Sequence, residues 1–267
     1  KEPMPENFKS IAKLAYLRLN TADDWEGQAH AYYPTIVIHT AWQIREMYGA
    51  QDVELKWNIG GSGKVFDFAL GETSVKRLVH FSTVASYGSF PDNSTDHRYT
   101  ENEPFRKTDY RYAEEKRIAE EHLEEKYEKS DKHTSVAVVR PAAITGPRGR
   151  FMRIRFGLQA SLSGALKGHG SFLYDLISLW VSWVPVTPKW LRQYIHEDDV
   201  VTIIERLAFG EKVNGYKVFN ICPPGPVVRG ADMAAAVGKR MLPIYPWMVR
   251  LAFFWVWHLK RGKIPTS

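Results

Sequence analysis

Short apolar runs recur along the chain, and stretches with helical periodicity separate them. The runs predicted as strands span residues 15–19, 35–40 (TIVIHT), 77–82 (RLVHFS), 135–140 (SVAVVR) and 217–222 (KVFNIC). The stretches predicted as helices span about 23–30, 53–70 and 109–127, and a further helical region begins at Gly230. Strands that alternate with helices pair in parallel through right-handed crossovers. The pattern therefore predicts an α/β fold built on a doubly wound parallel sheet.

The second half of the chain differs in composition from the first. Residues 151–188 are rich in Trp, Phe and Leu, which is typical of an inserted, mostly helical part. We expect residues 1–150 to form a core to which residues 190–222 return, and residues 151–189 and 223–267 to form a smaller, discontinuous capping part. Ligands of doubly wound sheets bind beyond the carboxyl ends of the strands. The residues directly after the predicted strands are therefore the first candidates for chemistry.

Composition narrows the function classes. The net charge of +6 comes from Lys and Arg interspersed with Asp and Glu, so no nucleic-acid groove is expected. A lone cysteine, Cys222, excludes an intramolecular disulfide, suits a reducing compartment and is predicted to be a small buried hydrophobe. The histidines lack metal-ligand spacing, so no metal site is expected. The longest apolar stretch, 172–186, falls short of the roughly 20 residues of a membrane span. We expect a cytoplasmic protein that binds a small molecule.

Two side chains on the predicted helix 109–127 suggest acid/base chemistry. Tyr112 and Lys116 stand four residues apart and would share one helix face. An ammonium beside a phenol favours the phenolate, so we expect Lys116 to lower the pKa of Tyr112 from about 10 toward neutrality. Thr83 follows the strand 77–82 at its carboxyl end, where its hydroxyl would meet the phenol. This setting favours a general acid/base over an ordinary surface helix.

Motifs in a fixed order accompany these residues. They are VIHTAW (37–42), NIGGS (58–62), STVASYG (82–88), YAEEKRIAE (112–120), RPAAITGP (140–147) and RQYIHEDDV (192–200). Over nearly the whole chain they resemble the motifs of the extended short-chain dehydrogenase/reductase family, the NAD-dependent epimerase/dehydratase group. The resemblance implies a Rossmann-type sheet and a hydride exchanged between a substrate carbon and a nicotinamide.

The resemblance also implies roles for matching residues. Tyr112 would exchange the hydroxyl proton, Thr83 would hydrogen-bond the reacting oxygen and Lys116 would hold the nicotinamide ribose. Asn58 would support Lys116 through water and so completes the implied catalytic set. Besides Tyr112 and Lys116, the implied cofactor-binding set contains Asn20, Thr21, Thr40, Ala41, Trp42, Pro141, Ala142, Ala143 and Ile144. The residues implied to bind substrate are Thr83, Ser86 and Arg192.

The chain departs from the family pattern in several places. The G-x-x-G-x-x-G loop that approaches the pyrophosphate has no match, so we expect the sheet to be incomplete at its N-terminal side by roughly 30 residues. GGSGKV (60–65) imitates a phosphate loop but lacks that motif's first Gly and final Ser or Thr. Trp42 stands where a small residue normally lies beside the cofactor. The residue that would read the ribose 2′ position is missing, so NAD and NADP both stay open, with NAD favoured.

Arg192 is the best indicator of the substrate. A guanidinium suits the diphosphate of a nucleotide sugar; a structural ion pair with Asp198 or Asp199 is the alternative. His39 and His196 are predicted to be structural. The aromatic and basic residues at 247–263 predict either a buried helix of the capping part or an interfacial helix in peripheral contact with a membrane.

Three functions follow from these observations. The favoured one is an NAD(P)-dependent epimerase/dehydratase or dehydrogenase that acts on a nucleotide sugar. The alternatives are a reductase or dehydrogenase of an apolar carbonyl or sterol-like substrate, and a non-catalytic relative with the same fold. The family's habit of pairing helices would place residues 53–70 and 109–127 in the interface of a homodimer.

Overall fold

The computed structural model describes residues 4, 6–44, 47, 49–90, 92–146, 183–188, 190–210, 213–236 and 238–260. The chain forms two compact units: residues 1–142 with 198–222, and residues 143–197 with 223–267. Most of the segment predicted to be an inserted helical part, residues 151–182, lies outside the described residues. The assignment of cofactor and substrate binding to separate parts of the chain stays a prediction.

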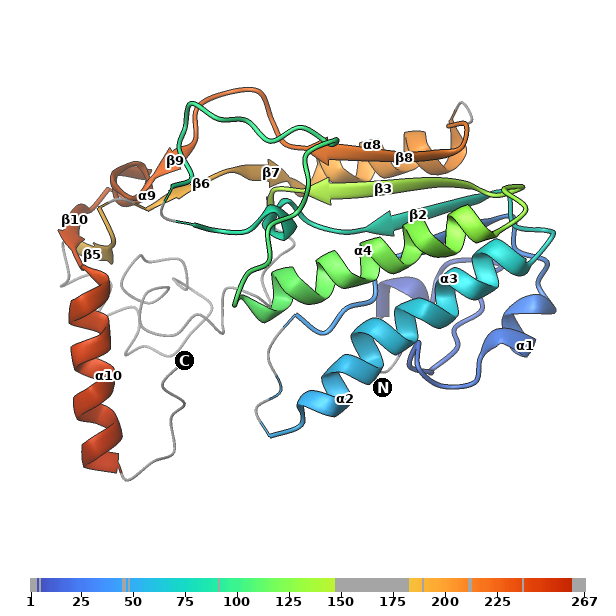
Figure 1. The fold of residues 1–267 in the computed structure, drawn as a ribbon, viewed down its shortest axis with the longest axis horizontal. Coiled ribbons are helices and arrows are strands. Elements are labelled where there is room, and N and C mark those ends of the chain that lie inside the picture. The colour runs from blue at the N-terminus through green and yellow to red at the C-terminus, as the bar shows by residue number, and fades with distance from the viewer. Residues whose placement is uncertain are drawn as a thin grey trace. The chain divides into compact units, whose positions relative to one another are not determined.

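A parallel sheet forms the centre of the first unit (Figure 1). In spatial order its strands are β1 (Ile36–His39), β2 (Arg77–Phe81), β3 (Ser135–Pro141) and β8 (Tyr216–Ile221). In the register of this sheet Val37 lies opposite Leu78, and Leu78 opposite Val136. The predicted α/β fold with a parallel Rossmann-type sheet is confirmed. The strand predicted at residues 15–19 is wrong: this stretch has no regular secondary structure, is mostly exposed, and no strand of the described residues pairs with it.

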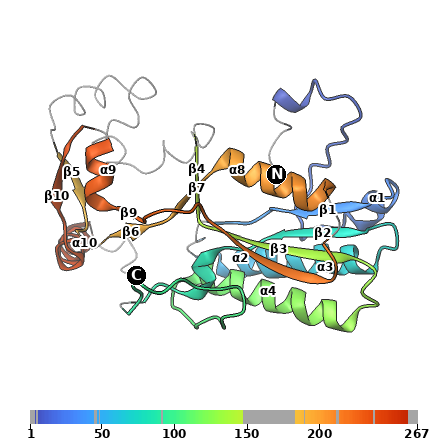
Figure 2. The same ribbon diagram turned by 90° about the horizontal axis from the view of Figure 1, so that it is seen from above.

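Helices cover both faces of this sheet (Figure 2). One layer contains α2 (Gln51–Leu55), the π-helical segment η2 (Lys56–Gly60), α3 (Gly61–Gly71) and α4 (Arg111–Lys129), and the other contains α8 (Glu197–Phe209). Neighbouring strand residues point to opposite faces: Leu78 packs in a cluster with residues of α3 and α4, and Val79 in a cluster with Ala208 of α8. This alternation produces the two-sided core expected of a doubly wound sheet.

Short elements complete the two units. The first unit adds α1 (Glu26–His30) and the 3-10 turns η1 (Glu6–Phe8) and η3 (Val84–Tyr87). In the second, β4 (Ala143–Thr145) pairs with β7 (Tyr194–His196), β5 (Trp183–Val186) with β10 (Arg240–Pro243), and β6 (Leu191–Arg192) with β9 (Val228–Arg229). The helices of this unit are α9 (Gly230–Ala236) and α10 (Pro246–Lys260). The helical region predicted from Gly230 is therefore interrupted by a strand.

Helix α10 has a largely exposed apolar side. Trp247, Leu251, Phe254 and Trp255 are all about half exposed or more. Among the side chains of α10 whose burial the structure describes, none is buried, so the prediction of a buried helix is not supported by these residues. Among the helices that the structure describes, none is both long enough and apolar enough to cross a bilayer.

Cys222 and residues 60–65 were both interpreted from the sequence alone. Cys222 is exposed, so its prediction as a buried hydrophobe is wrong: β8 ends at Ile221, and the chain leaves the sheet there. Residues 60–65, which imitate a phosphate loop, belong to the helical run of η2 and α3. A helix cannot wrap its backbone amides around a phosphate as a phosphate loop does, so the rejection of that motif is confirmed.

A stacked pair of histidines lies on adjacent strands in the core. His39 and His80 face each other in register, their ring centroids are 5.3 Å apart, and both rings pack edge-on against Phe66. His39 bonds the Ser62 hydroxyl at 2.8 Å, whereas neither ring nitrogen of His80 has a partner among the described residues. Burial lowers the pKa of His39 to about 4 and that of His80 well below its ordinary value; the nearby charge of Lys116 adds to both effects. Both imidazoles are therefore neutral at pH 7.

This pair makes the fold sensitive to acid. The unfolded chain binds a proton on each histidine near pH 6.5 but the folded chain does not, so stability falls as the pH falls from about 6.5 toward 4. We expect His80→Leu, which also removes two unpaired nitrogens, to raise the free energy of unfolding at pH 5 by roughly 1–2 kcal/mol. Urea unfolding at pH 7 and pH 5 measures this, with His122→Leu at an exposed position of α4 as the control. If wild type and His80→Leu lost the same amount of unfolding free energy between pH 7 and pH 5, the interpretation would be contradicted.

Candidate active site

Thr83 and Tyr112 meet at the carboxyl end of β2. Thr83 lies two residues after Phe81, the last residue of the strand, and caps the turn η3, where its Oγ1 accepts a hydrogen bond from the Ala85 amide at 3.2 Å. Tyr112 lies in the first turn of α4, and its phenol interacts with the Thr83 side chain, which lowers the pKa of the phenol in part. The structure thus brings together the hydroxyl and the phenol that the sequence analysis paired.

Lys116 lies one turn further along α4 and is 4% exposed. Its Nζ donates to the Phe81 carbonyl oxygen at 2.5 Å and lies 3.8 Å from the centroid of the Trp42 ring. Burial lowers the pKa of Lys116 to about 7, and the charge of Glu120 opposes this effect only in part. A buried ammonium without a carboxylate bound to it loses its proton more easily than one in water.

The pKa of Tyr112 differs from the sequence expectation. Burial raises it, the hydrogen bond from Thr83 lowers it in part, and the nearby Tyr110 adds to the rise. Lys116 does not lower this pKa as expected, because its own pKa of about 7 leaves it uncharged in the pH range in which a phenol ionises. In this structure Tyr112 is therefore a neutral phenol at pH 7.

Asn58 is fully buried in the π-helical segment η2. Its side chain accepts from the Gln43 amide at 2.8 Å, donates to the Gln43 carbonyl at 3.1 Å and donates to Glu115 at 2.7 Å. These bonds connect the segment after β1 to α4, next to Lys116. The direct partners of Asn58 are thus Gln43 and Glu115. Sequence analysis missed Glu115, although its place beside Lys116 in the motif was a usable signal.

Several buried polar atoms around this place lack partners among the described residues. They are the indole nitrogen of Trp42 and the hydroxyls of Ser82 and Ser86. Buried donors and acceptors in native proteins are nearly always paired, so unpaired ones need an explanation. Ser82 and Ser86 lie near Thr83 in the chain, and the Trp42 ring lies against Lys116. Unpaired polar atoms in such a place are what a binding site for a polar ligand requires.

The remaining residues predicted to bind cofactor occupy several places. Asn20 and Thr21 form a turn against α3. A side chain at Gly61 would come within 2.4 Å of the Thr21 hydroxyl, which explains the second glycine of NIGGS. Thr40 and Ala41 are exposed directly after β1. Pro141 and Ala142 are buried at the end of β3 in the first unit, whereas Ala143 and Ile144 begin the second.

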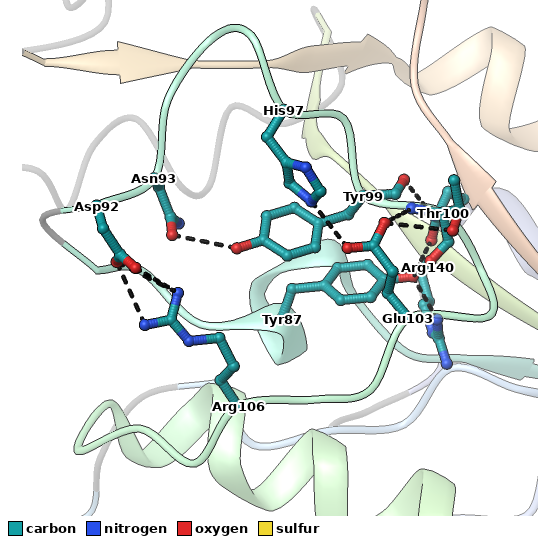
Figure 3. Close-up of polar contacts among 10 residues, drawn as sticks. Tyr87, Asp92, Asn93, His97, Tyr99, Thr100, Glu103, Arg106 and Arg140 are labelled. Atoms are coloured by element: carbon teal, nitrogen blue, oxygen red, sulfur yellow. Dashed lines mark hydrogen bonds and ion pairs between the residues drawn. The ribbon is translucent and has the colours of Figure 1, made fainter.

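A polar network holds the loop between Thr83 and Tyr112 (Figure 3). Arg140 of β3 forms a buried ion pair with Glu120 of α4 and donates to the Tyr87 hydroxyl. Tyr87 in turn donates to the Thr100 carbonyl at 3.0 Å, and its ring stacks on that of Tyr99 with centroids 4.7 Å apart. The same loop carries further contacts, which are Asp92–Arg106, Asn93–Tyr99 and His97–Glu103. The network thus holds the loop between the two catalytic candidates.

The Lys116 charge should impose a measurable cost on folding. The folded protein binds this proton more weakly than the unfolded chain, so the cost is present below pH 7 and fades between pH 7 and about 10.5. We therefore expect Lys116→Met to be more stable than wild type at pH 6, and this advantage to shrink by about 3 kcal/mol at pH 10. Urea unfolding across this range measures the difference. The control is Lys126→Met, on the same helix as Lys116, where Lys126 pairs with Asp67 of α3 at the surface. Its difference in free energy of unfolding from wild type should stay nearly constant across this pH range. The same constancy for Lys116→Met would refute the prediction.

Solved structures similar to this chain share its fold. The enzyme WbmG of Bordetella bronchiseptica in complex with NAD and UDP is 21% identical with a TM-score of 0.62, over 89% of this chain and 67% of that protein. UDP-glucose 4-epimerase of Thermus thermophilus, in complex with NAD, is 20% identical with a TM-score of 0.62, over 96% and 83%. dTDP-glucose 4,6-dehydratase (rfbB) of Bacillus anthracis str. Ames, in complex with NAD, is 16% identical with a TM-score of 0.62, over 94% and 76%.

Sequence comparison identifies the family independently of these structures. Among curated proteins no sequence matches the chain. The family model of the NAD dependent epimerase/dehydratase family matches residues 1–222, which is most of the chain. With Thr83, Tyr112 and Lys116 together at the carboxyl end of β2, the extent of this match shows that the chain belongs to the NAD dependent epimerase/dehydratase family.

Proposed function

We propose that the chain carries out NAD-dependent oxidoreductase or epimerase chemistry on a nucleotide sugar, with Thr83, Tyr112 and Lys116 as catalytic residues. The observation that carries this proposal is the interaction of the Thr83 side chain with the Tyr112 phenol, one helical turn from the buried Lys116 ammonium. A hydroxyl and a phenol that interact in this way can bind one substrate oxygen between them. Lys116 supplies a third donor on the same helix.

The residues around Lys116 fit a cofactor with hydroxyl groups. The Ser82 and Ser86 hydroxyls are buried without partners among the described residues, and a bound polar ligand would satisfy them. When bound, the nicotinamide of NAD supplies the hydride acceptor. We propose Lys116 for its ribose, and keep Asn20, Thr21, Thr40, Ala41 and residues 141–144 as proposed contacts of the cofactor. The Trp42 ring lies against Lys116 in the place of such a ligand and is not kept among these contacts.

Tyr112 has the protonation state of a general acid. Its phenol is neutral at pH 7 because burial raises its pKa, so it is set to donate a proton to a carbonyl oxygen while Thr83 donates a hydrogen bond to the same atom. The reverse reaction needs the phenolate, which a positive charge nearby would favour. A fully protonated Lys116 is the charge that the chain itself provides.

Arg192 supports a substrate that carries phosphate. Its side chain is exposed on β6, with the guanidinium carbon 5.8 Å from the centroid of the Tyr194 ring. A planar guanidinium beside an aromatic ring can bind a diphosphate bidentately without losing its charge. The WbmG complex contains UDP, which agrees with a nucleotide sugar as the substrate class.

Removal of the phenol tests the chemistry. We expect Tyr112→Phe to lower kcat by at least about 100-fold, because general acid–base catalysis contributes on this scale, and to leave NAD affinity within about twofold. Turnover of UDP-glucose and dTDP-glucose, followed by product analysis, and isothermal titration with NAD measure the two effects. Tyr110→Phe, at the exposed neighbouring ring, is the matched control. Retention of more than a few per cent of activity in Tyr112→Phe would refute the assignment.

Removal of the guanidinium tests the substrate class. We expect Arg192→Ala to raise the KM for a nucleotide sugar by roughly tenfold or more, as the loss of a charge-assisted bidentate contact implies, and to weaken the binding of free UDP in parallel. Arg229→Ala, on the paired strand β9, is the control and should change neither value. Normal KM and UDP binding in Arg192→Ala would favour an apolar carbonyl as the substrate instead.

A further inference from the structure

The contacts of Lys116 leave one face of its ammonium on an aromatic ring. Its hydrogen bond goes to the Phe81 carbonyl, and the Trp42 ring centroid lies 3.8 Å from Nζ. The two carboxylates nearest to it in α4 are bound elsewhere: Glu115 to Asn58 and Arg111, and Glu120 to Arg140. The indole therefore takes the position at which a ligand oxygen would approach the amine.

The resting position of Trp42 leaves its own polar group unsatisfied. The indole nitrogen is buried and has no acceptor among the described residues. A buried donor without an acceptor is unfavourable, so the cation–π contact holds the ring there at the expense of this hydrogen bond. A ligand oxygen that took the place of the ring would accept a hydrogen bond from the ammonium, and an indole that had turned away could bond water through its N–H.

The segment that carries Trp42 is held at the next residue. Both backbone polar groups of Gln43 bond to the buried Asn58 side chain, and the Met47 amide donates to Glu54 at 2.7 Å. These bonds fix the backbone after β1 relative to the helices that carry Asn58 and Glu54. Movement of the indole away from Lys116 therefore requires a change of side-chain rotamer and no rearrangement of the sheet.

We propose that Trp42 is a removable cap on Lys116, which covers the amine and must turn away before a ligand hydroxyl can reach it. The identity of this ligand as the cofactor ribose rests on the proposed function; the cap itself does not. Trp42 is in this view a positioning residue that sets how easily the cofactor binds, because the open conformation is only a fraction of the ligand-free population.

Acetylation of Lys116 in the whole chain without cofactor tests the cap. Acetic anhydride reacts with the neutral amine, and peptide mass spectrometry gives the rate for Lys116 relative to the exposed Lys9 of the same molecule. We expect Trp42→Ala to raise the relative rate roughly tenfold, as loss of a desolvated aromatic contact implies, and Trp42→Phe, which keeps an aromatic face, to stay within about threefold of wild type. Trp25→Ala, which removes an indole packed on Phe68, is the matched control and should leave the rate unchanged.

Three results would overturn the cap. They are a wild-type rate in Trp42→Ala, equal rates in Trp42→Phe and Trp42→Ala, and an equal acceleration in Trp25→Ala, which would indicate general loosening. Titration with NAD separates the cap from the proposed function. If the cap is right and the chain binds NAD, Trp42→Ala binds it several-fold more tightly than wild type. If no variant binds NAD but Trp42→Ala is acetylated faster, the proposed function fails and the cap stands.

Discussion

The burial of one ammonium governs the arrangement of the candidate site. Lys116 is almost inaccessible to water, yet its hydrogen bond goes to a neutral carbonyl and its nearest ring is an indole. A charge in such a place loses solvation that neutral partners replace only in part. This loss lowers the pKa of Lys116 to about 7, and the same charge disfavours protonation of His39 and His80 in the sheet below. The core and the site are therefore coupled electrostatically.

Asn58 and Arg140 fix the two sides of this arrangement by different means. Asn58 connects the segment after β1 to α4 through neutral hydrogen bonds, in a π-helical turn of a kind that often occurs at functional sites. Arg140 connects β3 to α4 through a buried ion pair, whose disruption would leave an unpaired charge. Between them Tyr87 holds the loop that separates Thr83 from Tyr112. The two catalytic candidates are thus placed by groups that do not themselves react.

Sequence reasoning was reliable where the signal was periodic or carried by a motif. Strand β2 and helix α4 were predicted within a few residues, because an apolar run and an amphipathic repeat report directly on burial. The pairing of Thr83 with Tyr112 followed from their places at a strand end and on a helix face. Residues 15–19 resemble a strand equally well, but a strand also needs a neighbour, and a local pattern does not reveal one. The exposure of Cys222 likewise depends on where β8 ends.

The protonation states could not be predicted, because they depend on burial. The spacing of Tyr112 and Lys116 suggested a lowered phenol pKa, but burial raises the pKa of Tyr112 and lowers that of Lys116 to about 7, so the ammonium loses its proton before the phenol does. Nor does the sequence show that Trp42, unusual at its position, would cover Lys116.

The site holds a protonated phenol and an amine close to its midpoint, so at neutral pH it carries less positive charge than the residues suggest. A ligand oxygen that replaced the indole would hydrogen-bond the ammonium and raise the pKa of Lys116. The restored charge would in turn favour the Tyr112 phenolate. Ligand entry and activation of the phenol are then one electrostatic event, in which the position of Trp42 decides when the charge is present.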